Sequence, residues 1–164
     1  MIRQITAKDT YEIRGEILRP GQPEARRQFP DDDAPETLHL GYFTEGLKLV
    51  GVATVLHDPP PNTNNPNAWR LRGMATLPEV RGKGYGEQLL LASIGHVASK
   101  GGNIIWCKAR TPAIAFYQRH GFLPDGEEFL IDESGPHYYM ARRMISESDK
   151  THARTIIYFS TACG

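Results

Sequence analysis

A turn with three glycines and two basic residues is the part of the sequence best suited to chemistry. It reads Arg-Gly-Lys-Gly-Tyr-Gly over residues 81–86. Glycines this close together let the backbone bend tightly and approach a ligand with no Cβ atoms in the way. The next residues, 87–99, are helix formers, and the first turn of a helix carries unpaired N–H groups and the positive end of the dipole. Arg81 and Lys83 add positive charge, so the stretch predicts an anion site, with phosphate as the favoured anion.

The spacing of the glycines restricts which phosphate ligand the turn could bind. No GxxxxGK[ST] string occurs, so a P-loop is excluded. A dinucleotide fingerprint, GxGxxG, would need its third glycine at Glu87 or Leu89, and both fail. The remaining pattern is Arg-x-x-Gly-x-Gly, which follows an apolar-rich run stopped by Pro78. The alternative reading is a glycine-rich loop that opens an ordinary helix.

The elements that must position this turn can be predicted from periodicity and turn signals. Helical patterns cover three segments. The first starts at Thr6 or at residues 8–10 and ends at Pro20, and the other two are residues 87–99 and 111–120. In the last of these, Thr111 is the expected N-cap, Pro112 the first helical residue and Gly121 the stop. Residues 122–126 should form a turn. Strand patterns occupy residues 1–7, 37–43, 48–56, 68–77, 103–110, 127–132 and 137–143.

The predicted order is therefore β-α-β-β-β-α-β-α-β-β. Strands 68–77 and 103–110 are joined by a helix, which makes them a parallel, right-handed βαβ pair. Residues 19–35, rich in Pro and charge, form either a loop near a substrate entrance or a solvated connector, and the connector is favoured. At 164 residues the chain suits one domain with a substantial core.

A second motif gives the glycine turn a context. Residues 113–122 read Ala-Ile-Ala-Phe-Tyr-Gln-Arg-His-Gly-Phe. This resembles the A-x-x-[LF]-Y-x-x-x-G-F signature of the GCN5-related N-acetyltransferases, the GNAT superfamily, and residues 81–86 resemble its acyl-CoA pyrophosphate motif, [Q/R]-x-x-G-x-[G/A]. Tyr117 lies 31 residues after Gly86, which leaves room for a helix, a strand and half a helix. The resemblance implies an α/β (α+β) acyl-CoA N-acyltransferase fold, with a mixed, mostly antiparallel sheet, a splayed parallel strand pair and flanking helices.

The same resemblance implies acetyl-CoA as co-substrate, held in the gap between the parallel strands. Backbone groups of residues 74–76 would pair with the pantetheine arm, and amides of residues 81–87 would hold the pyrophosphate. Tyr117 would protonate or hydrogen-bond the departing sulfur, since a phenol with a pKa near 10 stays protonated at neutral pH; the alternative is a packed aromatic. The implied cofactor-binding residues are Met74, Ala75, Thr76, Arg81, Gly82, Lys83, Gly84, Tyr85, Gly86, Glu87, Arg110, Phe116 and Arg119.

Two arginines in the region of the second motif, Arg110 and Arg119, each have two possible roles. Arg110 stands where the family often has Asn, seven residues before the tyrosine, so this chain has no Asn there to contact pantetheine. Arg110 could instead meet a cofactor phosphate or an acidic group of the substrate. Arg119 either reaches the adenosine 3′-phosphate or lies on a solvated helix face.

The general base is harder to identify, because residues 68–77 contain no acid where many family members place a Glu. Glu79 is expected to cap the turn or pair with Arg81. His57 and His137 are the candidates, since imidazole titrates near neutrality, and His137 is preferred. A structural histidine and a water chain remain alternatives. No metal is expected.

The composition restricts partners and location. The 19 basic and 19 acidic residues give zero net charge, which argues against broad nucleic-acid or membrane-surface binding. Two cysteines without a CxxC pattern, and no signal-like or transmembrane run, predict a cytoplasmic protein. The acetyltransferase-like domain is predicted over residues 1–144. The extension, residues 145–164, either pairs with a sheet edge in the same chain, forms a homodimer contact or stays disordered.

The expected function is transfer of an acetyl group from acetyl-CoA to a primary amine, by direct attack in a ternary complex. The acceptor is a small molecule or a peptide, which the fold alone does not identify. The alternative is a degenerate family member that binds acyl-CoA and regulates or scaffolds a partner. A nucleic-acid-binding protein that uses the basic turn is a third, weaker hypothesis.

Overall fold

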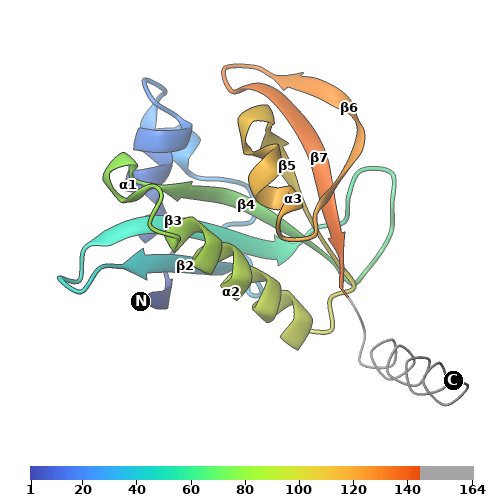
Figure 1. The fold of residues 1–164 in the computed structure, drawn as a ribbon, viewed down its shortest axis with the longest axis horizontal. Helices are drawn as coiled ribbons and strands as arrows, with labels where there is room; N and C mark the ends of the chain where they lie inside the picture. Colours follow the sequence, from blue (N-terminus) through green and yellow to red (C-terminus); the bar gives the residue numbers. More distant parts are fainter. Residues whose placement is uncertain (145–164) are drawn as a thin grey trace, which may run out of the picture.

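A seven-stranded mixed sheet organises the computed structural model, which describes residues 1–144 (Figure 1). Its strand order is β1-β2-β3-β4-β5-β7-β6, and every described neighbouring pair is antiparallel except β4 with β5. The strands are β1 (Ile2–Ile5), β2 (Leu38–Phe43), β3 (Leu49–His57), β4 (Ala68–Thr76), β5 (Ile104–Arg110), β6 (Leu123–Ile131) and β7 (Gly135–Arg143). The predicted order of strands and helices is confirmed; the predicted C-terminal extension lies outside the described residues.

Helices flank the sheet at three points. The first segment runs from a 3-10 turn (Lys8–Thr10) through α1 (Tyr11–Ile13) into a π-helical turn (Arg14–Leu18). Short 3-10 turns cover Glu24–Arg27, Pro78–Val80 and Thr111–Ala113, the last leading into α3 (Ile114–Gln118). The longest helix, α2 (Tyr85–Ser99), packs across the sheet. No helix among residues 1–144 is long and apolar enough to cross a membrane.

The hydrophobic core explains why α2 is fixed so firmly against the sheet. Leu89, Leu90 and Val97 repeat at helical spacing and are fully buried. They join the buried side chains of β3 and β4, two strands rich in β-branched and apolar residues, in one continuous cluster. Because the core anchors the whole helix, it also fixes the position of the turn that precedes it.

The parallel strands β4 and β5 start together and then diverge, as Figure 1 shows. They pair only between residues 68–70 and 104–106. On its other side, β4 has a bulge where the register with β3 shifts between Val52 and Thr54. Gly73 lies in this bulge with φ of +59°, a conformation that glycine adopts at little cost. The predicted splayed parallel pair is confirmed, and the β5-facing edge of residues 71–76 is left without a strand partner.

Three local expectations need correction. Residues 19–35 are mostly exposed or half-buried, as a solvated connector would be, but Asp32 within them is only 4% exposed. Residues 122–126 are not a turn, because β6 already begins at Leu123 and carries a bulge between Asp125 and Phe129. Thr111 does not cap its helix: its hydroxyl donates to the Glu128 carboxylate at 2.8 Å.

Candidate active site

Two cavities lie along the edge of β4 that the splay leaves unpaired. The larger, of about 590 Å³, opens between β4 and β5 and is lined by residues 71–74. The smaller, of about 320 Å³, lies at the start of α2 and is lined by Thr76 and the glycine turn. Residues 74–76 therefore connect the two cavities. An extended ligand arm running from one to the other would pass this free strand edge, as the resemblance to the GNAT superfamily implies for the pantetheine arm.

The glycine turn presents its backbone to the smaller cavity. Gly82 and Gly84 have φ of +78° and +79°, and an added Cβ would meet no protein atom within 4 Å at either position. Gly84 directly precedes α2, and no hydrogen bond from the amides of residues 85–87 is made within residues 1–144. These donors and the helix dipole fit an anionic pyrophosphate. A structure with open glycine positions and free amides thus suits acyl-CoA.

The other predicted cofactor residues divide between the two cavities. Met74 and Arg110 line the larger one, whereas Lys83 and Ala75 line neither. Around the smaller cavity, Arg119 packs over the ring of a neighbouring aromatic side chain, 6.0 Å from its centroid. The predicted residues that line the smaller cavity are Thr76, Arg81, Gly82, Gly84, Tyr85, Gly86, Glu87, Phe116 and Arg119.

Tyr117 lies in the wall of the larger cavity, at the end of α3. Its ring packs edge-on against Phe116 and Phe122, with centroids 5.2 and 5.4 Å away, so the packed aromatic of the alternative reading is also present. The hydroxyl makes no hydrogen bond within residues 1–144. Burial, with the Cys107 thiol adding to it, raises the pKa of Tyr117 well above its usual value. The phenol therefore keeps its proton at neutral pH.

His137, on β7, lines the same cavity. Its Nδ1 lies 2.8 Å from the carbonyl oxygen of Gly135, which can only accept, so Nδ1 carries the proton and Nε2 is left as an acceptor. Burial lowers the pKa of His137 below its ordinary value. The hydrogen bond to Gly135 opposes this shift, and the charges of Arg110, Arg19 and Lys108 reinforce it. A neutral imidazole with a free nitrogen is the form that can accept a proton.

The remaining candidates do not reach the cavity in a reactive form. His57 lies outside the lining and packs against Trp69, with ring centroids 3.8 Å apart and the rings tilted by 38°. Glu79 pairs with Lys48 at 3.0 Å, and within residues 1–144 it forms no ion pair with Arg81, one of its two expected roles. Cys107 does line the cavity, but burial raises the pKa of its thiol to about 12, so it is a poor nucleophile at neutral pH. Among residues 1–144, no group of three or more metal-ligating side chains occurs.

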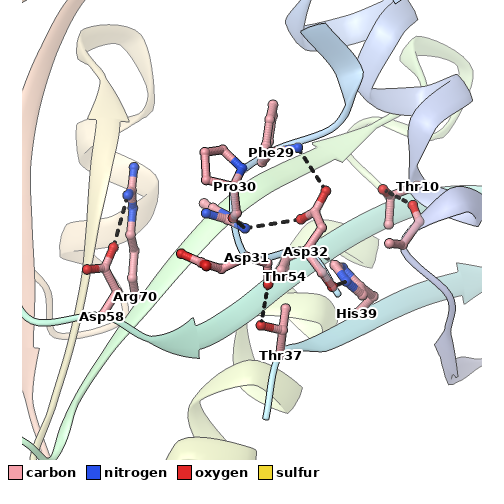
Figure 2. Close-up of polar contacts among 12 residues, drawn as sticks. Thr10, Phe29, Pro30, Asp31, Asp32, Thr37, His39, Thr54, Asp58 and Arg70 are labelled. Atoms are coloured by element: carbon pink, nitrogen blue, oxygen red, sulfur yellow. Dashed lines mark hydrogen bonds and ion pairs between the residues drawn. The ribbon is translucent and has the colours of Figure 1, made fainter. Parts of the chain in front are cut away.

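A polar network around Asp32 supports part of the wall of the larger cavity, and Figure 2 shows Asp32 beside Phe29, Pro30 and Asp31. The Asp32 carboxylate accepts from Arg14 at 2.6 and 3.2 Å, from Arg72 at 3.1 Å and from the Phe29 amide at 2.9 Å. Arg14 also donates to Thr54, and Arg72 to the carbonyl of residue 30. This network holds the loop at residues 29–31, which lines the cavity.

The geometry defines a class of protein before any comparison. A mixed sheet whose parallel pair diverges around a cavity, with a glycine turn at the start of the following helix, is typical of an acyl-CoA N-acyltransferase. A family model of the acetyltransferase (GNAT) family matches residues 5–122. The chain is also 34% identical over 143 residues to YitI of Bacillus subtilis, an uncharacterized N-acetyltransferase, covering 87% of this chain and 95% of YitI.

Solved structures show the same fold at lower identity. ElaA of Escherichia coli is similar with a TM-score of 0.71 and 18% identity, covering 87% of this chain and 99% of its own. An aminoglycoside 6′-N-acetyltransferase solved with coenzyme A has a TM-score of 0.70 and 14% identity, covering 90% and 98%. The match to the family model and the similarity to YitI show that the chain belongs to the acetyltransferase (GNAT) family and is an N-acetyltransferase.

Sequence reasoning missed the Arg14–Asp32 network and the cavity wall that it supports. Asp32 lies in a run of three aspartates, a pattern usually typical of a solvated segment. One signal was available, since Arg14 interrupts the apolar face of the first helical segment between Ile13 and Ile17. A charged residue among core positions requires a buried partner.

Proposed function

We propose that this chain transfers the acetyl group of acetyl-CoA to a primary amine by direct attack within a ternary complex. The observation that carries the proposal is the cavity between β4 and β5, which a protonated Tyr117 and a neutral His137 both line. Acetyl-CoA supplies the acetyl thioester when bound. The residues that would hold it are the glycine turn at its pyrophosphate and residues 74–76 along its arm.

The two titratable side chains suit opposite proton transfers. The neutral amine attacks the thioester carbonyl, so that a C–N bond forms and the C–S bond breaks. Nε2 of His137 accepts the proton that the amine loses, directly or through a water. The Tyr117 hydroxyl donates its proton, or a hydrogen bond, to the sulfur that leaves. The separation of a proton donor from a proton acceptor by environment is a common feature of acid–base sites.

Isothermal titration with acetyl-CoA, followed by thiol-release assays over a panel of amines, tests this function. Binding together with turnover of an amine supports the enzyme. Binding without turnover of any amine would instead favour the alternative, an acyl-CoA-binding regulatory or scaffolding protein. A protein that binds no acetyl-CoA would contradict the proposal at its first step.

The glycine turn gives the titration a specific variant. Gly84→Val should weaken acetyl-CoA binding at least about ten-fold, because the side chain enters the space in front of the free amides and disfavours the positive φ. Gly126→Val is the matched control, since Gly126 has φ of +81° and equally open surroundings but lies on β6. Equal affinity in the two variants would refute the pyrophosphate assignment.

The pH dependence of kcat/KM tests the base. Because the pKa of His137 is lowered, the neutral imidazole becomes the major form at a lower pH than in a free histidine. The acid limb of the profile should therefore have its midpoint below the ordinary value of about 6.5. His137→Ala should remove this limb and lower the rate about a hundred-fold. His57→Ala is the control and should keep the limb. An unchanged profile in His137→Ala would exclude it as base.

A further inference from the structure

The larger cavity contains more positive charge than its own carboxylates can balance. Two of its cations are paired: Arg70 with Asp58 at 3.1 Å, and Arg72 with Asp32 at 3.1 Å. The neutral net charge of the chain gives no hint of this local excess. The cationic residues of the lining are Arg19, Arg70, Arg72, Lys108 and Arg110, and the acidic ones are Asp31 and Asp58.

The excess is concentrated in three side chains. Within residues 1–144, neither Arg19, Lys108 nor Arg110 forms an ion pair with a carboxylate. Arg19 and Arg110 both donate to the carbonyl oxygen of Leu18, at 3.0 and 3.1 Å, which brings the two guanidinium groups together. Arg19 also donates to the Ser134 hydroxyl at 3.3 Å. Two cations that share one acceptor still have free donors for an anion.

The position of this pair relative to the base limits the size of its ligand. Arg110 on β5 lies directly opposite His137 on β7 in the sheet register. Side chains of such cross-strand partners are neighbours on the same face, with Cβ atoms about 5 Å apart. A ligand whose amine reaches His137 could therefore place a group only a few bonds away beside Arg110.

We propose that the acceptor is a small amine that carries an oxyanion, a carboxylate or a phosphate, and that Arg19 and Arg110 bind this oxyanion. The proposal rests on the proposed function and names its substrate class. The planar donor forks of arginine match the oxygens of either group. Polyamines and aminoglycosides carry several positive charges and no anionic group, so the cations of this cavity would repel them.

The positive charge also has a use in the reaction. An acceptor amine must lose its proton before it attacks, and nearby cations favour the neutral form of an amine. The same charges help to keep His137 neutral. The positive charges of the cavity would repel a purely cationic acceptor. An oxyanion, by contrast, anchors the acceptor and leaves its amine near cations that favour the neutral form.

The test compares amines that differ only in this anionic group. An amino acid series is assayed by thiol release beside the corresponding carboxamides, decarboxylated amines and aminoalkyl phosphates, with spermidine and kanamycin as cationic acceptors. We expect kcat/KM for the best oxyanion-bearing amine to exceed that of its uncharged analogue at least about ten-fold. Whether the carboxylate or the phosphate series is faster identifies the source of the oxyanion.

Each other result has a distinct meaning. Acetyl-CoA binding with a preference for uncharged or cationic amines would overturn this proposal and leave the proposed function intact. No acetyl-CoA binding would overturn both. If acetyl-CoA binds and no amine reacts, the N-acetylated amino acids and their amides are titrated into the complex with coenzyme A, and equal affinity for the two would overturn the proposal.

Variants of the two arginines give a second test. Arg110→Gln and Arg19→Gln should each raise KM for the oxyanion-bearing acceptor at least about ten-fold, with little change for its carboxamide or in the Kd for acetyl-CoA. Arg26→Gln is the control, because Arg26 is exposed and pairs with Glu133 outside the cavity lining. A rise in the acetyl-CoA Kd of Arg110→Gln, with acceptor KM unchanged, would assign Arg110 to the cofactor and contradict its proposed role.

Discussion

Tyr117→Phe is expected to lower kcat about a hundred-fold, since a positioned proton donor contributes this much or more to a reaction rate. The ring and its contacts with Phe116 and Phe122 are retained, so only the hydroxyl is tested. Burial raises the pKa of Tyr117, which keeps the proton available throughout the neutral range. Because the hydroxyl acts on the sulfur as it leaves, the Kd for acetyl-CoA should change by no more than about two-fold.

The measurement is single-turnover acetyl transfer together with isothermal titration of acetyl-CoA. Tyr42→Phe is a matched control, because Tyr42 and Tyr117 are each 8% exposed and Tyr42 lies outside the cavity linings. The control should keep kcat within about two-fold. If the rate of Tyr117→Phe also stayed within this range, Tyr117 would be a packing residue and the proton donor would have to be sought elsewhere.

The parts of the site that depend on local sequence could be predicted. A turn with positive φ before a helix favours glycine, so Gly82 and Gly84 are visible from their spacing alone. Tyr117, at the end of α3, packs edge-on against Phe122, which lies only five residues later, and such local spacing is visible in the sequence. The order of strands and helices along the chain followed from the same kind of signal, namely apolar runs bounded by Gly and Pro.

The parts of the site that depend on long-range pairing could not be predicted from the sequence. Asp32 pairs with Arg14 and Arg72, which lie 18 and 40 residues away, and nothing local distinguishes it from its exposed neighbours. Arg110 and Arg19 meet at one carbonyl only through the fold. The start of β6 was missed for a related reason: Pro124 looks like a turn residue, but an edge strand tolerates proline because one side needs no hydrogen bond.

The buried network connects the stability of the fold to the shape of the cavity. Arg14, which is fully buried, lies 4.2 Å from the centroid of the Phe29 ring, and Arg72 lies 5.6 Å from it. The two guanidinium groups and the Phe29 amide all converge on Asp32, so one carboxylate holds a loop, a helix and a strand. A single substitution can therefore affect both properties.

Asp32→Asn should destabilise the protein by about 3–5 kcal/mol, the usual cost of leaving a buried charge without its partner. Arg14, which is fully buried, and Arg72, which is largely buried, would be left with only an amide between them. Urea unfolding measures the change as a lower midpoint at constant m-value. Asp33→Asn is the matched control, since Asp33 is the exposed neighbour in the same run, and its effect should stay within about 0.5 kcal/mol.

The difference in the free energy of unfolding between wild type and Asp32→Asn should depend on pH, and this dependence identifies its cause. Burial alone would raise the pKa of Asp32, but the hydrogen bonds from Arg14 and from the Phe29 amide outweigh burial and lower it. A lowered native pKa means that the carboxylate stabilises the fold fully above its unfolded value, about 3.9, and that this stabilisation is lost as the pH falls through the native value. The difference in the free energy of unfolding between wild type and Asp32→Asn should therefore become smaller as the pH is lowered.

A stability difference that stayed constant into the acid range would show that Asp32→Asn is destabilised by altered packing and not by the loss of charge. The same variant also reports on the cavity wall. Because the loop at residues 29–31 depends on Asp32 and lines the larger cavity, the acceptor KM should rise even at low temperature, where the variant is fully folded. The glycine turn lies outside this network, so the affinity for acetyl-CoA should be the last property to change.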